Sequence, residues 1–312
     1  MKAKPRALVA CPLPTAGLDL LSTCFVIEVG DRRPDRTWLL EHVPGVAAIV
    51  TDPSVRVDSA LLDAAGPSLK VVSNFGVGFD NIDLDAVRAR GVRATNTPDV
   101  LTGTTAELAV ALMLAAGRRL AEADALARGG QWPDTLLGRE LIGSTVGVVG
   151  FGRIGRRVAE LLRGFDVRLL FTTRSDQPAP GGAERRELSD LLASSDFVSL
   201  HVPLTADTRH LIDSTALQRM KRGAILVNTS RGAVVDTGAL VAALRSGRLG
   251  AVGLDVYENE PHIPAELREL PNTVLLPHIG SATAMARDAM ARLCAQNALT
   301  AVEGREPPAA LV

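Results

Sequence analysis

The sequence predicts an α/β protein built around mainly parallel β-sheet, and three observations support that fold class. Short apolar runs, typical of buried strands, alternate with helical patterns along nearly the whole chain. Apolar residues make up 46% of the chain and charged residues 22%, values typical of globular rather than disordered proteins. The length of 312 residues allows about two domains with cores of ordinary size.

Short apolar runs mark the candidate strands in both halves of the chain. Most successive runs are separated by a helical pattern, which is how parallel strands are connected. The candidate strands cover residues 6–10, 46–51, 70–73, 145–150, 167–171, 197–201, 224–228, 251–255 and 273–276.

A long helix is expected between the two halves, from residue 104 to about 127. Thr104 and Glu107 have the spacing of a capping box at its start, and two glycines at 129 and 130 follow its end. Before this helix, residues 74–98 are rich in Gly, Asn and Asp, and Thr97-Pro98 at their end breaks any helix. The long helix is therefore expected to bridge two structural units.

The second unit is expected to run strand–helix–strand from 145 to about 280. The amphipathic stretch from 284 to about 302 has no strand after it, so we expect this helix to return to the first unit. The predicted domains are therefore a discontinuous one, 1–98 with 286–312, and a continuous one, 99–285.

Composition excludes several classes of function. The net charge of −1 argues against sequence-independent nucleic-acid binding, and 3% aromatic residues argue against base stacking. None of the four lysines lies in a Walker-type loop, and the five histidines and three cysteines lack metal-ligand or disulfide spacing. With no full signal peptide and no membrane-length apolar run, we expect a cytoplasmic protein without a membrane partner.

The strongest functional motif is Gly150-Phe151-Gly152-Arg153-Ile154-Gly155, between an apolar run and a helical pattern. In such a strand–turn–helix, Gly150 allows the tight turn and Gly152 lets the backbone approach a pyrophosphate. Gly155 lets the helix and strand pack closely. An ordinary strand–helix turn needs one glycine rather than three, so we expect a bound dinucleotide.

The end of the next expected strand, 167–171, indicates which dinucleotide. An acidic residue there would bind the ribose hydroxyls of NAD, but Thr173, Arg174 and Ser175 stand in its place. A guanidinium attracts a 2′-phosphate that a carboxylate would repel, so NADPH is expected and NADH is less favoured. The alternative is that Arg174 is one of 30 arginines and only solvated.

Arg231, Glu260 and His278 each follow an expected strand. Ligands of open α/β sheets bind beyond the carboxyl ends of the strands, so these side chains are expected to converge. Taken singly, Arg231 is equally consistent with a surface turn residue, Glu260 with a solvated acid and His278 with a capping or core histidine. The three together, after a cofactor loop, favour a catalytic site.

The motifs GFGRIG, HVPLT, NTSRG, LDVYENEP and PHIGSAT, in this order, resemble the D-isomer-specific 2-hydroxyacid dehydrogenase family. The segment SNFGVGFDNID at 73–83 resembles a first-domain loop of that family, and the likeness covers about 70–295. Within the family, the chain is most similar to NADPH-dependent glyoxylate/hydroxypyruvate reductases. The resemblance implies a Rossmann-like, doubly wound dinucleotide-binding domain and a smaller, flavodoxin-like substrate domain.

The resemblance also implies roles for the candidate residues. Arg231 would hold the substrate carboxylate and polarise the keto oxygen. His278 would donate a proton to the developing alkoxide, and Glu260 would bind the other ring nitrogen so that the imidazole starts protonated. Backbone amides of Val77 and Gly78 would bind the carboxylate from the other domain, so that closure completes the site.

Further residues carry over as cofactor contacts, two of which have other readings. Asp255 is also consistent with a strand-end acid that caps the next turn, and Thr105 with a helix cap. Trp132 would either reach the substrate pocket of a partner subunit or pack in its own loop. The implied contacts are Arg153 and Ile154 at the pyrophosphate, Val202 and Pro203 at the adenosine, Thr229 and Asp255 at the nicotinamide, and Thr105.

The remaining histidines and cysteines have no expected catalytic role. His201 lies near the cofactor without an obvious proton to move, whereas His42, His210 and His262 are expected to be surface or loop residues. Cys294 is expected to be a core thiol.

The activity implied by the resemblance is the NADPH-dependent reduction of glyoxylate and hydroxypyruvate to D-2-hydroxy acids, by a homodimer. Phenylpyruvate-type substrates are the nearest alternative, and phosphoglycerate, formate and phosphite dehydrogenases share the scaffold. A different class is an NAD(P)-sensing protein without turnover, such as the corepressors that resemble this family. No long disordered tail or basic segment favours that class.

Overall fold

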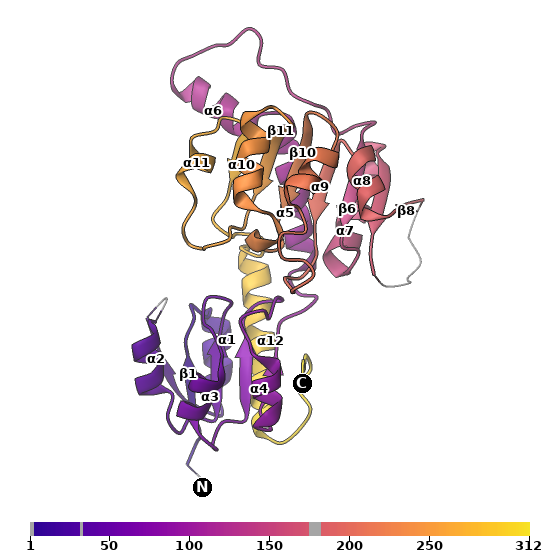
Figure 1. The fold of residues 1–312 in the computed structure, drawn as a ribbon. Coiled ribbons are helices and arrows are strands. Elements are labelled where there is room, and N and C mark those ends of the chain that lie inside the picture. Colours follow the sequence, from indigo (N-terminus) through magenta and orange to yellow (C-terminus); the bar gives the residue numbers. More distant parts are fainter. Residues whose placement is uncertain (1–2, 32–33, 175–181) are drawn as a thin grey trace. The chain divides into compact units, whose positions relative to one another are not determined.

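The computed structural model describes residues 3–31, 34–174 and 182–312, which form two compact units. The first unit consists of Met1–Leu101 and Ser281–Val312, and the second of Thr102–Gly280 (Figure 1). From the sequence, we place the boundaries after residues 98 and 285. In the structure, the first division coincides with the start of helix α5 and the second with a turn that precedes helix α12.

A five-stranded parallel sheet forms the middle of the first unit, in the order β2-β1-β3-β4-β5. This is the strand order of flavodoxin-like folds. The predicted strands omit β2, an edge strand with no buried residue, and β5, which has only 3 residues. The strands are β1 (Arg6–Val9), β2 (Val26–Val29), β3 (Ala48–Thr51), β4 (Val71–Asn74) and β5 (Arg93–Thr95).

Three helices of the first unit begin at aspartates. The side chains of Asp35, Asp58 and Asp83 each accept a backbone N–H three residues later, which caps three of the helices. The final helix packs on β4 and against the first helix. It thus returns to the first unit, which is all that the sequence predicts of it. The helices are α1 (Thr15–Ser22), α2 (Arg36–His42), α3 (Ser59–Ala65), α4 (Leu84–Ala89) and α12 (Ala284–Val302).

A seven-stranded parallel sheet forms the middle of the second unit, in the order β12-β11-β10-β9-β6-β7-β8. Counted from β6, this is the doubly wound order 3-2-1-4-5-6 with a seventh strand added, so the predicted fold class is confirmed. Strand order reverses between β6 and β9, and ligands bind at such a switch point. The strands are β6 (Thr145–Val149), β7 (Arg168–Thr172), β8 (Glu184–Arg185), β9 (Phe197–Leu200), β10 (Ala224–Asn228), β11 (Leu249–Leu254) and β12 (Thr273–Leu275).

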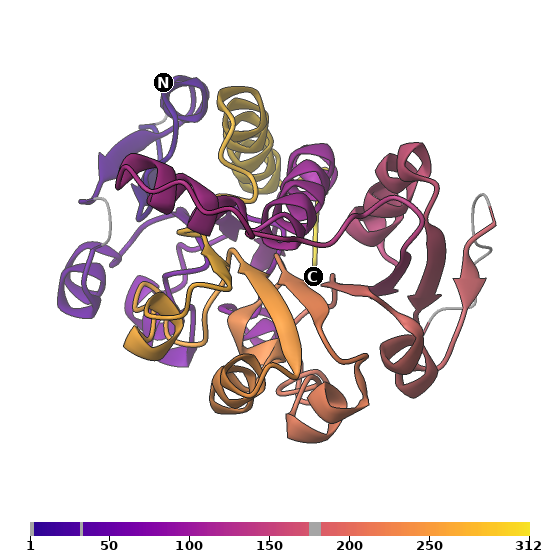
Figure 2. The same cartoon turned by 90° about the horizontal axis from the view of Figure 1, so that it is seen from above.

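Helices cover both faces of this second sheet, with α5 and α10 on opposite sides (Figure 2). One core cluster contains Met113 of α5 and Val158 of α7, and the other contains Leu217 of α9 and Leu240 of α10. In the described part of the chain, no helix is long and apolar enough to cross a membrane. The helices are α5 (Thr102–Gly117), α6 (Leu120–Arg128), α7 (Arg153–Leu162), α8 (Leu188–Ser194), α9 (Ser214–Arg219), α10 (Thr237–Arg245) and α11 (Ala265–Arg268), with short 3₁₀ turns at Arg163–Phe165 and Gly232–Val234.

The single helix predicted from 104 to about 127 is wrong, because the chain breaks it into α5 and α6. The carbonyl of Gly117 accepts the backbone N–H of Arg139 at 2.7 Å, so it does not continue the helical ladder. Arg119 then adopts a left-handed backbone with φ 54°. The predicted capping box is also wrong, since α5 begins at Thr102 and Thr104 lies inside its first turn.

Candidate active site

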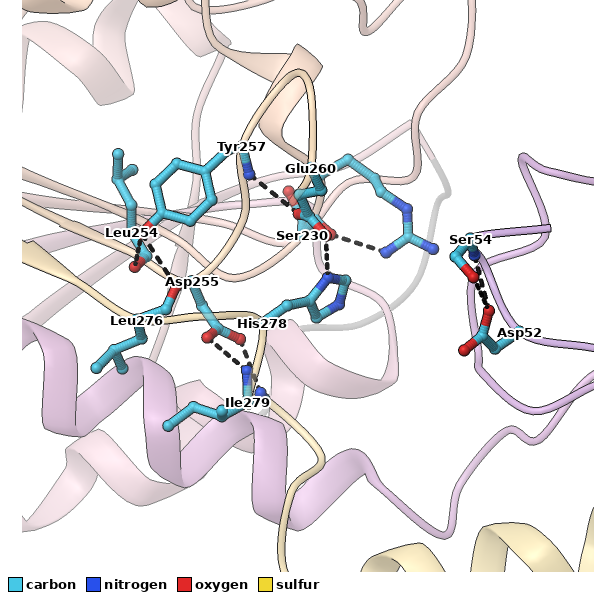
Figure 3. Close-up of polar contacts among 12 residues, drawn as sticks. Asp52, Ser54, Ser230, Leu254, Asp255, Tyr257, Glu260, Leu276, His278 and Ile279 are labelled. Carbon is cyan, nitrogen blue, oxygen red and sulfur yellow. Dashed lines mark hydrogen bonds and ion pairs between the residues drawn. The ribbon is translucent and has the colours of Figure 1, made fainter. Parts of the chain in front are cut away.

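Three neighbouring strands of the second sheet bring the candidate catalytic residues to one edge. Arg231 follows β10, Glu260 follows β11 and His278 follows β12. Because these strands are parallel, their carboxyl ends lie on the same side of the unit. Glu260 and His278 are in direct contact (Figure 3), and the charge of Arg231 acts on Glu260.

His278 and Glu260 form a short, half-buried hydrogen-bonded pair. Nδ1 of His278 lies 2.6 Å from Oε2 of Glu260. Burial raises the pKa of the Glu260 carboxyl, but the hydrogen bond and charge of His278 outweigh burial and hold that pKa below its usual range. A carboxylate only accepts, so Nδ1 carries a proton and Nε2 is the nitrogen that faces other partners.

Tyr257 anchors the loop that carries Glu260. Its backbone N–H donates to Oε1 of Glu260 at 3.0 Å, and its hydroxyl donates to the carbonyl of Leu276 at 3.0 Å (Figure 3). The ring is buried in the core cluster of the second unit. The loop after β11 is thus tied to the end of β12, close to His278.

Asp255 holds the turn that follows His278. Its two carboxylate oxygens accept the N–H groups of Ile279 and Gly280, each at 2.7 Å. Burial is the largest influence on this carboxyl and raises its pKa, although the two N–H groups oppose it. Thr105 donates to the carbonyl of Gly280 at 3.1 Å, so both residues predicted as cofactor contacts brace the histidine-bearing turn.

A compact turn positions Arg231. The side chain of Asn228 accepts from Ser230 and donates to the carbonyl of Arg231 at 2.9 Å. Beyond the arginine, Gly232 lies so close to the Tyr257 backbone that a Cβ there would overlap it. The arginine-bearing turn and the glutamate-bearing loop therefore pack directly on each other.

The glycine-rich turn between β6 and α7 fits a dinucleotide. Gly150 has φ 94°, and a Cβ there would lie 2.6 Å from the carbonyl oxygen of His201. A Cβ at Gly155 would overlap the carbonyl of Gly150, whereas a Cβ at Gly152 would meet nothing within 4 Å. The fold itself requires the first and third glycines, and the second faces open space at a helix N-terminus that has no side-chain cap, where a pyrophosphate is favoured.

In the described part of the segment after β7, the chain carries Thr173 and Arg174, neither of them acidic. Arg174 lies 3.3 Å from Asp207, but their side chains are 74% and 80% exposed, so this ion pair contributes little in water. The guanidinium is therefore available to a stronger anion. Ser175, the third residue predicted there, lies outside the described residues.

Three other residues predicted as cofactor contacts, Val202, Pro203 and Thr229, lie in the second unit. Val202 packs against the glycine turn, with its Cγ1 2.9 Å from where a Cβ of Gly150 would lie, and the carbonyl of Pro203 is held by Thr208 at 2.6 Å. The buried hydroxyl of Thr229 has no hydrogen-bond partner among the described residues. Leaving such a group unpaired is costly, so a bound polar group would complete this position.

In the first unit, two asparagines orient the loop predicted to bind a carboxylate. Asn96 donates to the carbonyl of Val77 at 2.8 Å and Asn74 to that of Gly78 at 2.7 Å. In the part of the chain that the structure describes, no backbone carbonyl accepts the N–H of Val77 or Gly78. The loop therefore has two amide donors for an anion.

Comparison with known proteins identifies the family. The family model described as D-isomer specific 2-hydroxyacid dehydrogenase, NAD binding domain, matches residues 110–280. A glyoxylate reductase from Thermococcus kodakarensis is 47% identical, over 98% of this chain and 95% of the length of that reductase. The chain belongs to the D-isomer specific 2-hydroxyacid dehydrogenase family. A protein of known structure from Thermus thermophilus superposes with a TM-score of 0.91 and 45% identity, over 98% of this chain and 100% of that one. An NADPH-dependent glyoxylate/hydroxypyruvate reductase from Sinorhizobium meliloti, in complex with NADP and malonate, gives a TM-score of 0.90 and 34% identity, over 99% and 97%.

As a member of this dehydrogenase family, the chain is an NAD(P)-dependent oxidoreductase that acts on 2-hydroxy acids. The family resemblance predicted from the motifs is confirmed. The matched residues lie in the second unit, which contains the glycine-rich turn, so this unit is the one that binds the nicotinamide cofactor.

The structure also reveals a histidine that the sequence interpretation set aside. His210, expected to be a surface or loop residue, has its Nε2 2.6 Å from Oε1 of Glu258. No spacing rule signals a pair 48 residues apart, although Glu258 stands two residues before Glu260. Burial lowers the pKa of His201 to about 4, so its ring is neutral at pH 7.

Proposed function

We propose that this dehydrogenase reduces glyoxylate and hydroxypyruvate to the corresponding hydroxy acids, with D configuration where the product is chiral, using NADPH. The observation that carries the proposal is the His278–Glu260 pair beside Arg231, which combines a proton donor with a cation for a carboxylate. Relatives named glyoxylate reductase and glyoxylate/hydroxypyruvate reductase support this substrate class.

The candidate residues divide the reaction between them. Arg231 binds the substrate carboxylate with its planar donors and polarises the keto oxygen. His278 donates the Nε2 proton to that oxygen, while Glu260 stabilises the imidazolium through Nδ1. The bound nicotinamide supplies the hydride. In the first unit, which we propose as the substrate domain, the amides of Val77 and Gly78 bind a carboxylate oxygen.

The cofactor contacts are proposed on the local geometry of the second unit. The open space at Gly152 and the N-terminus of α7 take the pyrophosphate, and the unpaired hydroxyl of Thr229 takes a polar group of the nicotinamide half. The proposed set is Gly150, Gly152, Arg153, Ile154 and Gly155 at the pyrophosphate, Val202 and Pro203 at the adenosine, Thr173 and Arg174 at the 2′-phosphate, and Thr105, Thr229 and Asp255 at the nicotinamide. The sequence adds Ser175 at the 2′-phosphate, a residue outside the described part of the chain.

NADPH preference is proposed on Arg174, which stands where NAD-specific enzymes carry an acid. Replacing Arg174 by Ala should lower kcat/KM for NADPH by about 10- to 100-fold, the worth of one charge-assisted hydrogen bond. The value for NADH should stay unchanged, because NADH has no 2′-phosphate. Steady-state kinetics with both cofactors measure this, and an equal loss with NADH would contradict the role.

A substrate panel tests the proposed function directly. Glyoxylate, hydroxypyruvate, phenylpyruvate and hydroxyphenylpyruvate are each added with NADPH and then with NADH, and cofactor oxidation is followed by absorbance. We expect the highest kcat/KM with NADPH and one of the two small acids. A preference for the aromatic acids would reassign the substrate, and cofactor binding without turnover on any acid would point to a sensor.

We also propose a cytoplasmic homodimer. Helix α6 has no buried residue. Residues 120–142 of the second unit expose the apolar side chains of Leu120, Trp132, Leu137 and Ile142, and Trp132 is 90% exposed. The three cysteines are free thiols, as is usual in a reducing compartment. Light scattering after size-exclusion chromatography should give twice the chain mass of 32.8 kDa, and Trp132→Glu with Leu137→Glu should shift the protein toward the monomer.

A further inference from the structure

A second histidine–glutamate pair lies next to the first in the second unit. Nε2 of His210 is 2.6 Å from Oε1 of Glu258, the same distance as in the His278–Glu260 pair. The two glutamates are separated by one residue, and both histidines have a left-handed backbone, with φ 51° and 55°. A left-handed backbone is costly for a residue with a side chain, so contacts around each histidine must hold it there.

His210 joins the segment before α9 to two loops of the site. Its backbone N–H donates to the carbonyl of Ala233 at 2.8 Å, two residues after Arg231. Its ring binds Glu258, whose other oxygen accepts the N–H of Thr237 at 3.4 Å. One residue therefore contacts both the arginine-bearing turn and the glutamate-bearing loop.

Direct packing extends these contacts to the reacting groups. Gly232, next to Arg231, lies against the backbone of Tyr257 and Glu258 with no room for a Cβ. The N–H of Tyr257 in turn holds Oε1 of Glu260 at 3.0 Å. A shift of the Glu258 segment would therefore move Arg231 and Glu260 relative to each other.

We propose that His210 and Glu258 are positioning residues that set the distance between Arg231 and the His278–Glu260 pair. This inference rests on the proposed function, in which Arg231 orients the keto acid and His278 delivers the proton. Catalysis is sensitive to such alignment, because a small displacement of a correctly oriented group lowers the rate steeply. The glycine-rich turn is not among their contacts, so binding of the cofactor pyrophosphate at that turn should not depend on them.

Two variants of His210 separate positioning from folding. Asn tolerates a left-handed backbone but is too short to reach Glu258, whereas Gln places a donor at the position of Nε2. His210→Asn should lower kcat for glyoxylate about ten-fold and raise KM for glyoxylate, with KM for NADPH within about two-fold of the wild type. His210→Gln should recover at least about half of the lost kcat, since the hydrogen bond to Glu258 is restored.

His42 supplies a matched control in the first unit. It is also half-buried, and its Nε2 lies 3.6 Å from Oε1 of Glu28, so His42→Asn removes a looser histidine–glutamate pair far from Arg231 in the sequence. We expect His42→Asn to leave kcat and both KM values unchanged. A wild-type kcat in His210→Asn would overturn the inference. The inference would also be overturned if the Asn and Gln variants lost the same amount of kcat and the same amount of melting temperature.

Hydrogen–deuterium exchange reports the same positioning without turnover. His210→Asn should speed amide exchange in residues 229–237 and 256–262 and leave residues 145–162 unchanged. Unchanged exchange in both loops would overturn the positioning role. If the wild type reduced no keto acid, the proposed function would fail, whereas faster exchange in the two loops would still support the role of His210.

Discussion

At the scale of single residues, the neighbours of His278 fix the tautomer and the orientation of its ring. Nδ1 is engaged by Glu260 at 2.6 Å, and the following turn is fixed by the carboxylate of Asp255. The ring is therefore held in one tautomer and one orientation, and Nε2 is the nitrogen that we propose faces the substrate. The sequence pattern predicts the identity of these residues, and the structure adds that Asp255 acts on the turn through both of its oxygens.

Replacing His278 by Gln tests the proton donor. Gln keeps a donor group of similar reach but has no proton to transfer, so kcat for keto-acid reduction should fall about 10²- to 10⁴-fold. KM for NADPH should change little, since the glycine-rich turn is untouched. Steady-state kinetics with the preferred acid measure both values, and a kcat above a tenth of the wild-type value would contradict the assignment.

Replacing Glu260 by Gln tests the pair itself. The pKa of the Glu260 carboxyl is held low, so this group is ionised and places a negative charge beside Nδ1 of His278. Gln removes that charge, so the pH profile of kcat/KM for reduction should move toward acid. A pH profile of kcat/KM that matches the wild type would exclude this role.

At the scale of elements, some glycines of the glycine-rich turn are required by protein packing and another is left free for a ligand. A Cβ at Gly150 would lie too close to the carbonyl of His201. A Cβ at Gly155 would overlap the carbonyl oxygen of Gly150. A Cβ at Gly152 meets nothing within 4 Å. One short motif thus contains two positions that protein packing requires and one that packing does not.

This difference predicts opposite outcomes for two alanine variants. Gly152→Ala should fold with an unchanged melting temperature but raise KM for NADPH about ten-fold, because the new methyl group occupies the approach of the pyrophosphate. Gly150→Ala should instead lower the melting temperature, since its φ of 94° and its close carbonyl neighbour both oppose a side chain. Calorimetry and cofactor titration distinguish the two, and a stable Gly150→Ala variant would contradict the argument.

At the scale of the whole molecule, one carboxylate connects three segments at the amino end of the second sheet. Asp196 accepts from Arg139 at 2.7 Å, from Lys221 at 3.2 Å and from the backbone N–H of Thr145 at 3.0 Å. Burial raises the pKa of Asp196, but these donors outweigh burial and lower it. These contacts lie at the strand ends opposite to the candidate active site, so their contribution is to stability.

The stability that Asp196 contributes should depend on pH. Because its pKa is lowered on folding, the contribution is complete above its ordinary value of 3.8 and is lost as pH falls through the folded value. Asp196→Asn should therefore lower the melting temperature at pH 7 by about 3–6 °C. The gap between variant and wild type should narrow in acid, and a gap of constant size in calorimetric scans from neutral to acidic pH would refute this account.

Local patterns account for what could be predicted of the fold and the site. The apolar runs locate most strands of both sheets, and the helix expected over 284–302 is α12. Strand β2 is not predicted because none of its residues is buried. The helix break at Arg119 is not predicted because it depends on a contact about 20 residues later, where the backbone N–H of Arg139 donates to the carbonyl of Gly117. The misses thus occur where tertiary contacts override local preference.

The sequence by itself determined the α/β class, the dinucleotide turn and the residue types Arg231, Glu260 and His278, because backbone geometry and motif spacing are local properties. Only the tertiary structure decided how these residues are held. It brings Glu260 within hydrogen-bond distance of His278 and lets the Asp255 oxygens accept the N–H groups of the turn after His278. It also brings His210 to Glu258 across 48 residues of chain, since such a contact depends on how parallel strands place their loops at a common edge.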